Sequence, residues 1–300
     1  MDFYQLEYVL AVAKYKNFTK ASEEMNVSQS SLSQQIAKLE DELGVRLFER
    51  TTRTVHILPA GAEFIEHAQR IINECRHAKH TIEEYKDVER GSLVIGGFPI
   101  ISHYNMIGLI ADFTRAYPKI NFEYKEADYF ELVEMLHTFE INAAFLHMRR
   151  EDPNLAYHHL MQDEVVIIVN NKHPLAQKEV VHLSEAKDEN FILSPANSLI
   201  FFDTVESCRI AGFEPKIVFN CSSISSMMGF VHENLGITLL SHRVALDQLI
   251  PGISIVKITP SVTRTLAITL RKDGHVMPAA RAFISFARQW VADRGLQNSV

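Results

Sequence analysis

Residues 1–45 alternate apolar and polar positions at helical spacing, with two short polar interruptions. The pattern predicts three short helices. Their buried stripes are Phe3, Leu6, Leu10 and Ala13, then Phe18, Ala21 and Met25, then Leu32, Ile36, Leu39 and Leu43. Ser28 is a suitable N-cap for the third helix, and Gly44 is suited to end it. We expect the three helices to pack as one small bundle.

The second and third helices have the lengths of a helix-turn-helix, a motif that places its second helix in the major groove of DNA. The polar face of the third helix predicts a set of DNA-reading residues, namely Ser28, Gln29, Ser30, Ser31, Ser33, Gln34 and Lys38. Glutamine side chains at such positions can pair with adenine through two hydrogen bonds. The alternative is an ordinary solvated face, which is the rule for a single amphipathic helix.

A polar run at residues 49–54 lies between two short apolar segments, Leu47-Phe48 and Val55 to Ile57. This arrangement predicts two short strands with a polar tip, which is the wing of a winged helix-turn-helix. Arg50 and Arg53 are then placed to contact phosphates or a narrow minor groove. Without a wing they would be ordinary surface arginines. We assign residues 1–58 to this module.

A long linker helix is predicted over residues 59–89, because Pro59 suits a first helical turn and neither Gly nor Pro follows Gly61 before about residue 87. Its apolar residues follow alternating three- and four-residue steps, with Lys79 in the one missing slot, as in a short coiled coil. They are Ile65, Ala68, Ile72, Cys75 and Ile82. We interpret them as a dimerisation seam, since a small bundle has little surface to cover so long a helix. The alternative is packing on the chain's own domain.

From residue 90 to residue 300 the pattern changes to strands that alternate with helical stretches such as 104–117. This alternation predicts an α/β domain with a largely parallel sheet. The predicted strands are residues 93–97, 120–124, 143–146, 165–169, 217–219, 237–240 and 266–270.

Ligands of open α/β sheets bind beyond the C-terminal ends of the strands, where backbone amides and helix N-termini converge. The segments after the first three predicted strands carry Pro99, Ile100, Ile101, Ser102, Asp128 and His147. We predict that these residues line a pocket for a small polar effector, with an anionic metabolite favoured. For Ser102 the alternative is a simple helix cap.

The composition is that of a globular protein, with 300 residues, 47% hydrophobic and 22% charged, a length that favours two domains of unequal size. A formal net charge of -7 excludes a protein that coats nucleic acid non-specifically. No apolar run reaches the ~20 residues of a membrane span, and the first residues do not resemble a secretory leader. We therefore expect a cytoplasmic protein with no membrane partner.

Motifs for catalysis or cofactor binding are missing from the sequence. His77 and His80 lie about one helical turn apart and His158 and His159 are adjacent, but neither pair has further ligands at metal-site spacing. Neither a dinucleotide fingerprint nor a phosphate loop follows the glycines at 96–97, and no nucleophile motif is present. We expect no metal, no cofactor and no enzymatic activity.

The chain resembles the LysR-type transcriptional regulators over essentially its whole length. The segments that carry the resemblance are FTKAS at 18–22, VSQSSLSQQI at 27–36, LE at 39–40, LGVRLFER at 43–50 and PAG at 59–61. Looser landmarks are GSLVIG at 91–96, YP at 117–118, HPLA at 173–176 and LGI at 235–237.

The resemblance implies a winged helix-turn-helix, a linker helix and a type 2 periplasmic-binding-protein-like effector domain. That domain would have one subdomain of residues 91–162 and 267–300 and another of residues 163–266, with the effector between them. Asn197 and Phe202 would complete the pocket from the second subdomain. Members of the family usually pair through the linker helix and form homotetramers on double-stranded promoter DNA. The implied function is therefore an effector-switched transcription regulator.

Several positions depart from the family pattern. Ser30 stands where proline is usual and Gln34 where arginine is common, so the base preference differs from that of many relatives. Asn142 replaces a common aspartate, and Asn234 replaces a common glycine. His147 stands where the family often has an arginine that meets a carboxylate, which weakens the expectation of an acidic effector.

The three cysteines are Cys75, Cys208 and Cys221, and they lack the paired spacings of a disulfide framework. Reduced, mostly buried thiols are the simplest interpretation. Some members of the resembled family sense redox state through thiols, and Cys208 and Cys221 fall in the same implied subdomain. A thiol redox-sensing regulator is therefore the alternative function.

Overall fold

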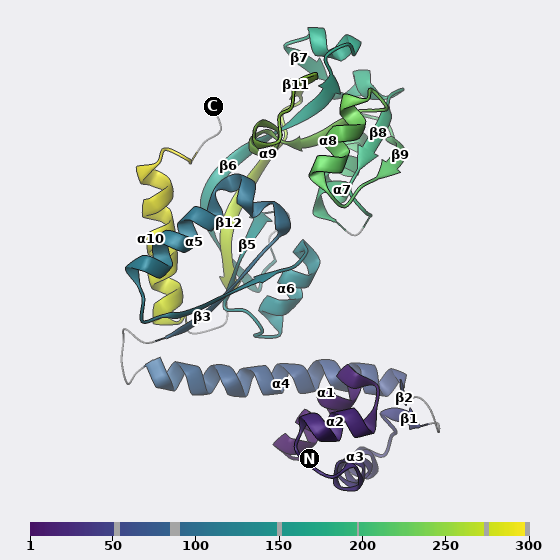
Figure 1. The fold of residues 1–300 in the computed structure, drawn as a ribbon, viewed down its shortest axis with the longest axis vertical. Helices are drawn as coiled ribbons and strands as arrows, with labels where there is room; N and C mark the ends of the chain where they lie inside the picture. The colour runs from purple at the N-terminus through teal and green to yellow at the C-terminus, as the bar shows by residue number, and fades with distance from the viewer. Residues whose placement is uncertain (51–54, 85–90, 149–151, 197, 273–275, 298–300) are drawn as a thin grey trace. The chain divides into compact units, whose positions relative to one another are not determined.

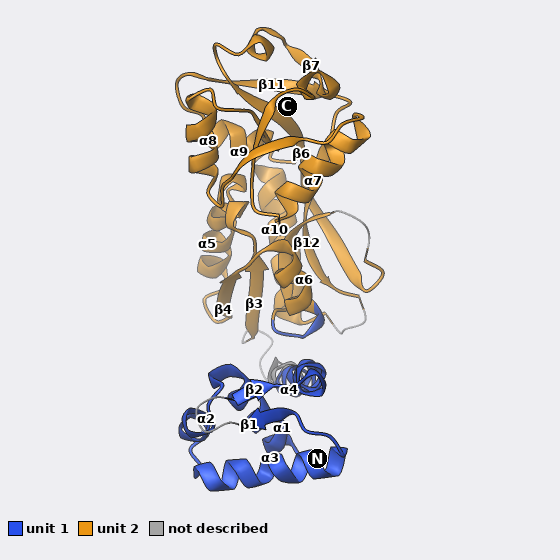
Figure 2. Ribbon diagram, turned by 90° about the vertical axis from the view of Figure 1, so that its right-hand side faces the viewer, with its two compact units in different colours: residues 1–87, 137–140 blue, residues 88–136, 141–300 orange. Residues whose placement is uncertain are grey.

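The computed structural model describes residues 1–50, 55–84, 91–148, 152–196, 198–272 and 276–297. The chain divides into two compact units, one of residues 1–87 with 137–140 and one of residues 88–136 with 141–300 (Figure 2). Among the described residues, no helix is long and apolar enough to cross a membrane.

The first unit contains a helical bundle, a hairpin and a long helix (Figure 1). Its elements are α1 (Phe3–Tyr15), α2 (Phe18–Glu24), α3 (Gln29–Leu43), β1 (Phe48–Arg50), β2 (Val55–Ile57) and α4 (Pro59–Glu84). The predicted helices and the antiparallel hairpin are confirmed, and Phe48 pairs with Ile57. The predicted linker helix is described as far as Glu84, and residues 85–89 of that prediction lie outside the described residues.

The core of the bundle fixes the orientation of α3. Leu32, Ile36 and Leu39 are fully buried against apolar side chains of α1 and α2. The Ser28 hydroxyl accepts a hydrogen bond from the Ser31 N–H at 3.2 Å, which caps the helix as expected. At the other end, Gly44 has a φ of 69°, a conformation that glycine adopts without strain.

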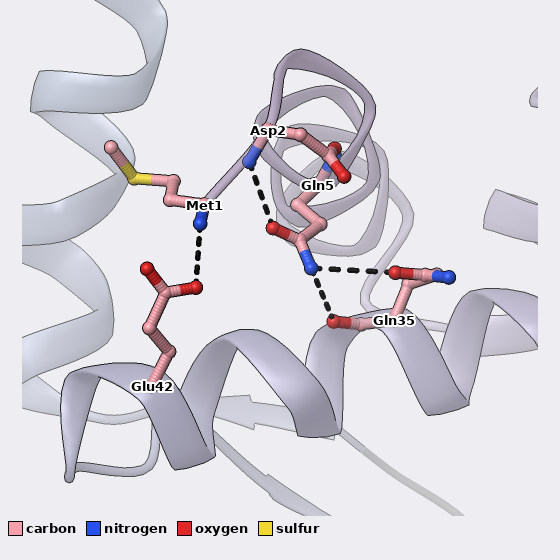
Figure 3. A network of polar contacts seen from close by, with 5 residues as sticks. All are labelled: Met1, Asp2, Gln5, Gln35 and Glu42. Carbon is pink, nitrogen blue, oxygen red and sulfur yellow. Dashed lines mark hydrogen bonds and ion pairs between the residues drawn. The ribbon is translucent and has the colours of Figure 1, made fainter.

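A polar network ties the start of α1 to α3 (Figure 3). The buried Gln5 side chain donates to both the backbone and the side-chain oxygen of Gln35, at 3.5 and 3.3 Å. Gln5 and Asp2 also cap each other at the start of α1. The amino group of Met1 forms an ion pair with Glu42 at 2.5 Å. These contacts leave the opposite side of α3 exposed.

The second unit consists of two halves that share one mixed sheet, of strand order β4-β3-β5-β12-β6-β11-β7, with β10 paired to β6. The first half contains β3 (Ser92–Gly97), η1 (Pro99–Tyr104), α5 (Met106–Ala116), β4 (Asn121–Glu126), α6 (Tyr129–His137), β5 (Ala143–Met148), β12 (Thr263–Arg271) and α10 (Pro278–Asp293). The second half contains η2 (Pro174–Gln177), β7 (Val180–His182), η3 (Leu183–Ala186), β8 (Asn190–Leu193), α7 (Leu199–Ile210), β9 (Lys216–Asn220), α8 (Ile224–His232), β10 (Thr238–Ser241), α9 (His242–Asp247) and β11 (Ile253–Thr259).

One long strand, β6 (Leu155–Asn170), joins the two halves. Its first part pairs with β12 and its last part pairs with β10 and β11, and all of these pairings are antiparallel. The expectation of a largely parallel sheet was therefore wrong. Parallel pairing holds for β3 with β4 and β5, where helices connect the strands, and for β7 with β11 and β8 with β9.

Two apolar cores stabilise the second unit. The larger core fills the first half, where the Phe113 and Phe283 rings of α5 and α10 meet edge to face at 4.9 Å, and it extends into α8 of the second half. A smaller core lies within the second half around Phe191, Val181 and Cys208. The α/β effector-domain fold that the resemblance implied is confirmed, and its two-core construction leaves room for a cavity.

Candidate DNA-binding surface and effector pocket

The predicted DNA-reading residues occupy the first two and a half turns of α3. Exposed side chains are those of Ser28, Gln29, Ser30, Ser31, Gln34 and Lys38, whereas Ser33 is half-buried. Ser30, Gln34 and Lys38 are spaced by four residues and therefore lie on one side of the helix. This side presents hydroxyl, amide and ammonium groups, the combination that reads base edges and phosphates.

Ser28 stabilises the start of α3, in addition to its predicted contact with DNA. Its hydroxyl caps α3 and lies 3.1 Å from the hydroxyl of Ser30. The two serines therefore hold the first turn in shape, and Gln29 and Gln34 are the longer side chains available to reach a base.

Glu40 positions the hairpin relative to α3, a role that sequence reasoning missed. One carboxylate oxygen accepts hydrogen bonds from the backbone N–H groups of Leu47 and Phe48, at 2.8 and 3.1 Å. The Leu39-Glu40 pair of the quoted motif was the available signal. Arg50 ends β1, but its side chain and the whole of Arg53 lie outside the described residues, so their contact with DNA stays a prediction.

The predicted dimerisation seam on α4 is only partly free. Ala68 and Ile72 are fully buried and form a cluster with Leu6 of α1 in the same chain. Ile65 packs against the core of the bundle and Cys75 is half-buried, whereas Ile82 is 60% exposed. The assumption that the bundle cannot cover this helix was wrong, because α1 supplies an apolar stripe along it.

A cavity of about 230 Å³ lies between the two halves of the second unit. Four of the predicted effector-binding residues line it, namely Pro99, Ile100, Asp128 and His147. They come from the segments after β3 and β4 and from the end of β5. The second half contributes residues around the start of α7 and α8, among them Ser194, Ser198, Ile200, Asp203 and Met227.

The other predicted pocket residues that the structure describes lie elsewhere. Ile101 is buried in the core, and Ser102 is exposed in the middle of η1 instead of starting a helix. Phe202 lines a separate groove with Phe130, whose ring it meets at 5.6 Å. Asn197 is not among the described residues. The strand-end argument therefore accounts for four of the residues that line this cavity, and Phe202, which the resemblance implied, is not among its described lining.

His147 is the most deeply buried polar residue of the cavity wall, with 4% of its surface exposed. Its ring lies 4.9 Å from Phe98 and 5.5 Å from Tyr104. Burial, together with the nearby Arg264 charge, lowers the pKa of His147 to about 3. The Thr265 backbone is the smallest influence and acts in the opposite direction. The imidazole is therefore neutral at physiological pH.

Buried Arg264 and half-buried Asp203 form an ion pair in the cavity wall. Nε of Arg264 lies 3.3 Å from the Asp203 carboxylate, and one terminal nitrogen donates to the Ser241 hydroxyl at 3.3 Å. Sequence reasoning missed both residues. An arginine next to the apolar run Leu266 to Ile268 of β12 was the signal that could have found Arg264, because a buried charge requires a partner.

A metal site is not indicated by this geometry. Within the described ranges, no group of three or more His, Cys, Asp or Glu side chains could hold a metal ion. The side chains of His77 and His80 lie outside those ranges.

The comparisons with known proteins cover both units. Residues 3–62 match the bacterial regulatory helix-turn-helix protein of the lysR family, and residues 86–292 match the LysR substrate binding domain. The transcriptional dual regulator GltC of Bacillus subtilis is 30% identical over 294 residues, with 97% of each chain covered. A hydrogen peroxide-inducible genes activator of Dickeya chrysanthemi is 30% identical over 273 residues, with 90% of each chain covered.

Two solved structures share the fold. A full-length OxyR variant from Pseudomonas aeruginosa has a TM-score of 0.69 at 25% identity, covering 97% of this chain and 94% of its own. Full-length CbnR in complex with its target DNA has a TM-score of 0.70 at 22% identity, covering 96% and 99%.

A helix-turn-helix module followed in the same chain by a two-part α/β unit defines a class of DNA-binding transcription regulators. Within that class, the matches over both units identify the family. The chain belongs to the LysR family of transcription regulators.

Proposed function

We propose that this chain binds promoter DNA through α3 and the β1–β2 hairpin, and that a small effector bound in the cavity switches its activity. The observation that carries the proposal is the cavity itself, which is built from both halves of the second unit. A ligand held by both halves stabilises one relative arrangement of them over others, and differential binding is what allows a ligand to shift a conformational equilibrium.

The DNA contacts divide into two kinds. Gln29, Ser33 and Gln34 read bases, since they lie near the start of α3, and Arg50 and Arg53 of the hairpin contact phosphates or the minor groove. The partners are therefore double-stranded promoter DNA, a small effector and further copies of this chain. Pairing uses the exposed side of α4 that includes Ile71 and Ile82, and pairs assemble as tetramers.

Selection of DNA fragments from a genomic library tests the DNA-binding part. The wild-type chain is expected to enrich one sequence class with two related half-sites, because a two-fold protein assembly reads two-fold sites. Gln34→Ala is expected to relax base preference at one position, at a cost of about 1 to 3 kcal/mol. Gln177→Ala, which removes an exposed glutamine from the second unit, is the matched control and should enrich the same sites as wild type. Identical enrichment by Gln34→Ala and wild type would contradict the assignment.

A peroxide response is the second candidate, because several relatives carry the name of hydrogen peroxide-inducible activators. The chemistry of the two candidate thiols opposes it here. Burial raises the pKa of Cys208 to about 12 and also raises the pKa of Cys221. Since the thiolate is the reactive form, neither thiol is activated for oxidation.

A further inference from the structure

We infer that the cavity selects a small, mainly apolar effector whose polar group is uncharged, such as a hydroxyl. This inference rests on the proposed function and specifies the chemical class of the effector. It departs from the anionic metabolite that the strand-end pattern favoured.

The size and lining of the cavity set the first limit. Its volume of about 230 Å³ lies below the ~300–1,000 Å³ of pockets that enclose drug-sized ligands. Aromatic and aliphatic side chains form most of the wall, including Phe98, Ile100, Tyr129, Ile200 and Met227. A ligand that fills this space therefore gains most of its affinity from burying a compact apolar body.

The charges around the cavity disfavour an anion. Among the described lining residues, two carboxylates, Asp128 and Asp203, stand against one guanidinium, Arg264. Arg264 already pairs with Asp203 and donates to Ser241. A carboxylate ligand that took Arg264 from Asp203 would compete with an ion pair already present inside the chain, which is unfavourable.

An ammonium group is disfavoured for related reasons. One oxygen of Asp128 accepts a hydrogen bond from the Glu131 N–H at 3.0 Å, and Asp203 is already paired. A cation would also lie near the Arg264 charge in a cavity where apolar walls penalise any ion. Only a neutral polar group avoids both penalties.

His147 brings unpartnered ring nitrogens to the cavity wall. Neither of its ring nitrogens has a hydrogen-bond partner among the described residues, although both are fully buried. A neutral imidazole has one N–H donor and one acceptor nitrogen, and a hydroxyl can both donate and accept. A ligand hydroxyl that reached the ring would satisfy a buried polar group that is otherwise unpaired, which gives the neutral ligand a specific advantage.

Thermal denaturation of the full-length chain with charge-matched compounds tests this inference. We would use benzyl alcohol, benzoate and benzylamine, and on a smaller frame isobutanol, isobutyrate and isobutylamine. At least one alcohol is expected to raise Tm by roughly 3 °C at about ten times its Kd, whereas the matched acid and amine give a smaller rise or none. An acid or amine that stabilises the chain as well as its alcohol would overturn the inference, and so would failure of both alcohols up to about 10 mM.

Three variants show whether the shift arises in this cavity. Ile200→Trp fills the space and is expected to abolish the shift. His147→Phe keeps a ring of similar size without the nitrogens and is expected to weaken alcohol binding roughly fivefold to tenfold. His147→Gln keeps a donor and an acceptor and should lose less, which separates hydrogen bonding from packing. A shift that persists in Ile200→Trp would overturn the inference.

The result is separable from the test of the proposed function. Binding of an acid that is lost in Ile200→Trp would leave this cavity as the effector site and change only the class of effector. Loss of the DNA preference would be seen in the fragment selection, which requires no ligand.

Discussion

His147 links the cavity to the stability of the second unit. In the unfolded chain a histidine has a pKa of about 6.5, whereas in the folded chain the pKa of His147 is about 3. Between these values the unfolded chain binds a proton that the folded chain does not. The stability that the folded chain derives from this pKa difference is therefore fully present above pH 6.5 and is lost as the pH falls toward 3.

Denaturant unfolding at pH 7.5 and pH 5 measures this effect. We expect the wild-type chain to lose about 1.4 kcal/mol of unfolding free energy for each pH unit below 6.5 through this residue. His147→Phe should lose correspondingly less between the two pH values. The exposed His67 provides a control, His67→Phe, that should keep the wild-type pH dependence. Equal pH dependence of His147→Phe and wild type would show that folding does not lower the pKa of His147.

The buried cysteines give a second expectation at the residue scale. Cys208 is held in the core of the second half, where burial and the Glu214 charge raise its pKa to about 12. We expect hydrogen peroxide to leave Cys208 and Cys221 reduced in the folded chain, as measured by mass spectrometry after thiol labelling. Cys75, which is half-buried, serves as the internal comparison and should label faster than Cys208. Formation of a Cys208–Cys221 disulfide in a chain that stays folded would favour the redox alternative.

Part of the pocket could be predicted at the level of single residues. Asp128 and His147 follow from the rule that ligands bind beyond strand ends, which requires only local strand positions. Arg264 and Asp203 do not, because their pairing brings together residues from β12 and α7 across the fold. The exposed Ser102 shows the limit of the rule, since it lies in η1 and is not among the residues that line the cavity with Ile100.

The ends of α3 determine how firmly the DNA-reading face is held. Ser28→Ala removes the hydroxyl that accepts from the Ser31 N–H and is expected to lower the unfolding free energy of the first unit by about 1 kcal/mol. Ser28→Asp should retain most of this stability, because aspartate also caps helices. Thermal denaturation compares the two variants. Equal loss in both would mean that the cap contributes little and that Ser28 acts through another contact.

Two isoleucines of α4 distinguish packing within one chain from the pairing of two chains. Ile72 is fully buried next to Leu6, so Ile72→Glu is expected to destabilise the first unit by several kcal/mol and to prevent its folding. Ile82 is 60% exposed, so Ile82→Glu should fold normally and weaken pairing of two chains. Circular dichroism and light scattering measure the two effects. A folded Ile72→Glu chain, or an Ile82→Glu chain that pairs like wild type, would contradict this division.

Helices with a complete apolar stripe were predicted more accurately than strands that form by pairing with strands distant in the sequence. The three helices of the first unit carry complete apolar stripes, and their bounds fall within a few residues of the structure. In β6 only residues 165–169 were predicted, because that part is continuously apolar and buried on both faces. Residues 155–164 include His158, Gln162 and Glu164 and become a strand through pairing with β12.

At the scale of the whole molecule, a transcription switch requires that the cavity and the DNA-reading face communicate through one chain. A ligand alters DNA binding only by its difference in affinity for the chain's alternative states, and this coupling is reciprocal. The effector should therefore change the affinity or the extent of DNA contact, and operator DNA should change the affinity for the effector by the same factor.

Footprinting on an operator obtained from the fragment selection tests this coupling most directly. The wild-type chain, the cavity-filling Ile200→Trp chain and the matched control Gln177→Ala would each be footprinted with and without the alcohol that stabilises the chain most. We expect the compound to change the protected region or its half-saturation concentration for wild type and Gln177→Ala, and to have no effect on Ile200→Trp, which should still bind the operator. A footprint that the compound leaves unchanged in wild type, or changes equally in Ile200→Trp, would contradict an effector switch in this cavity.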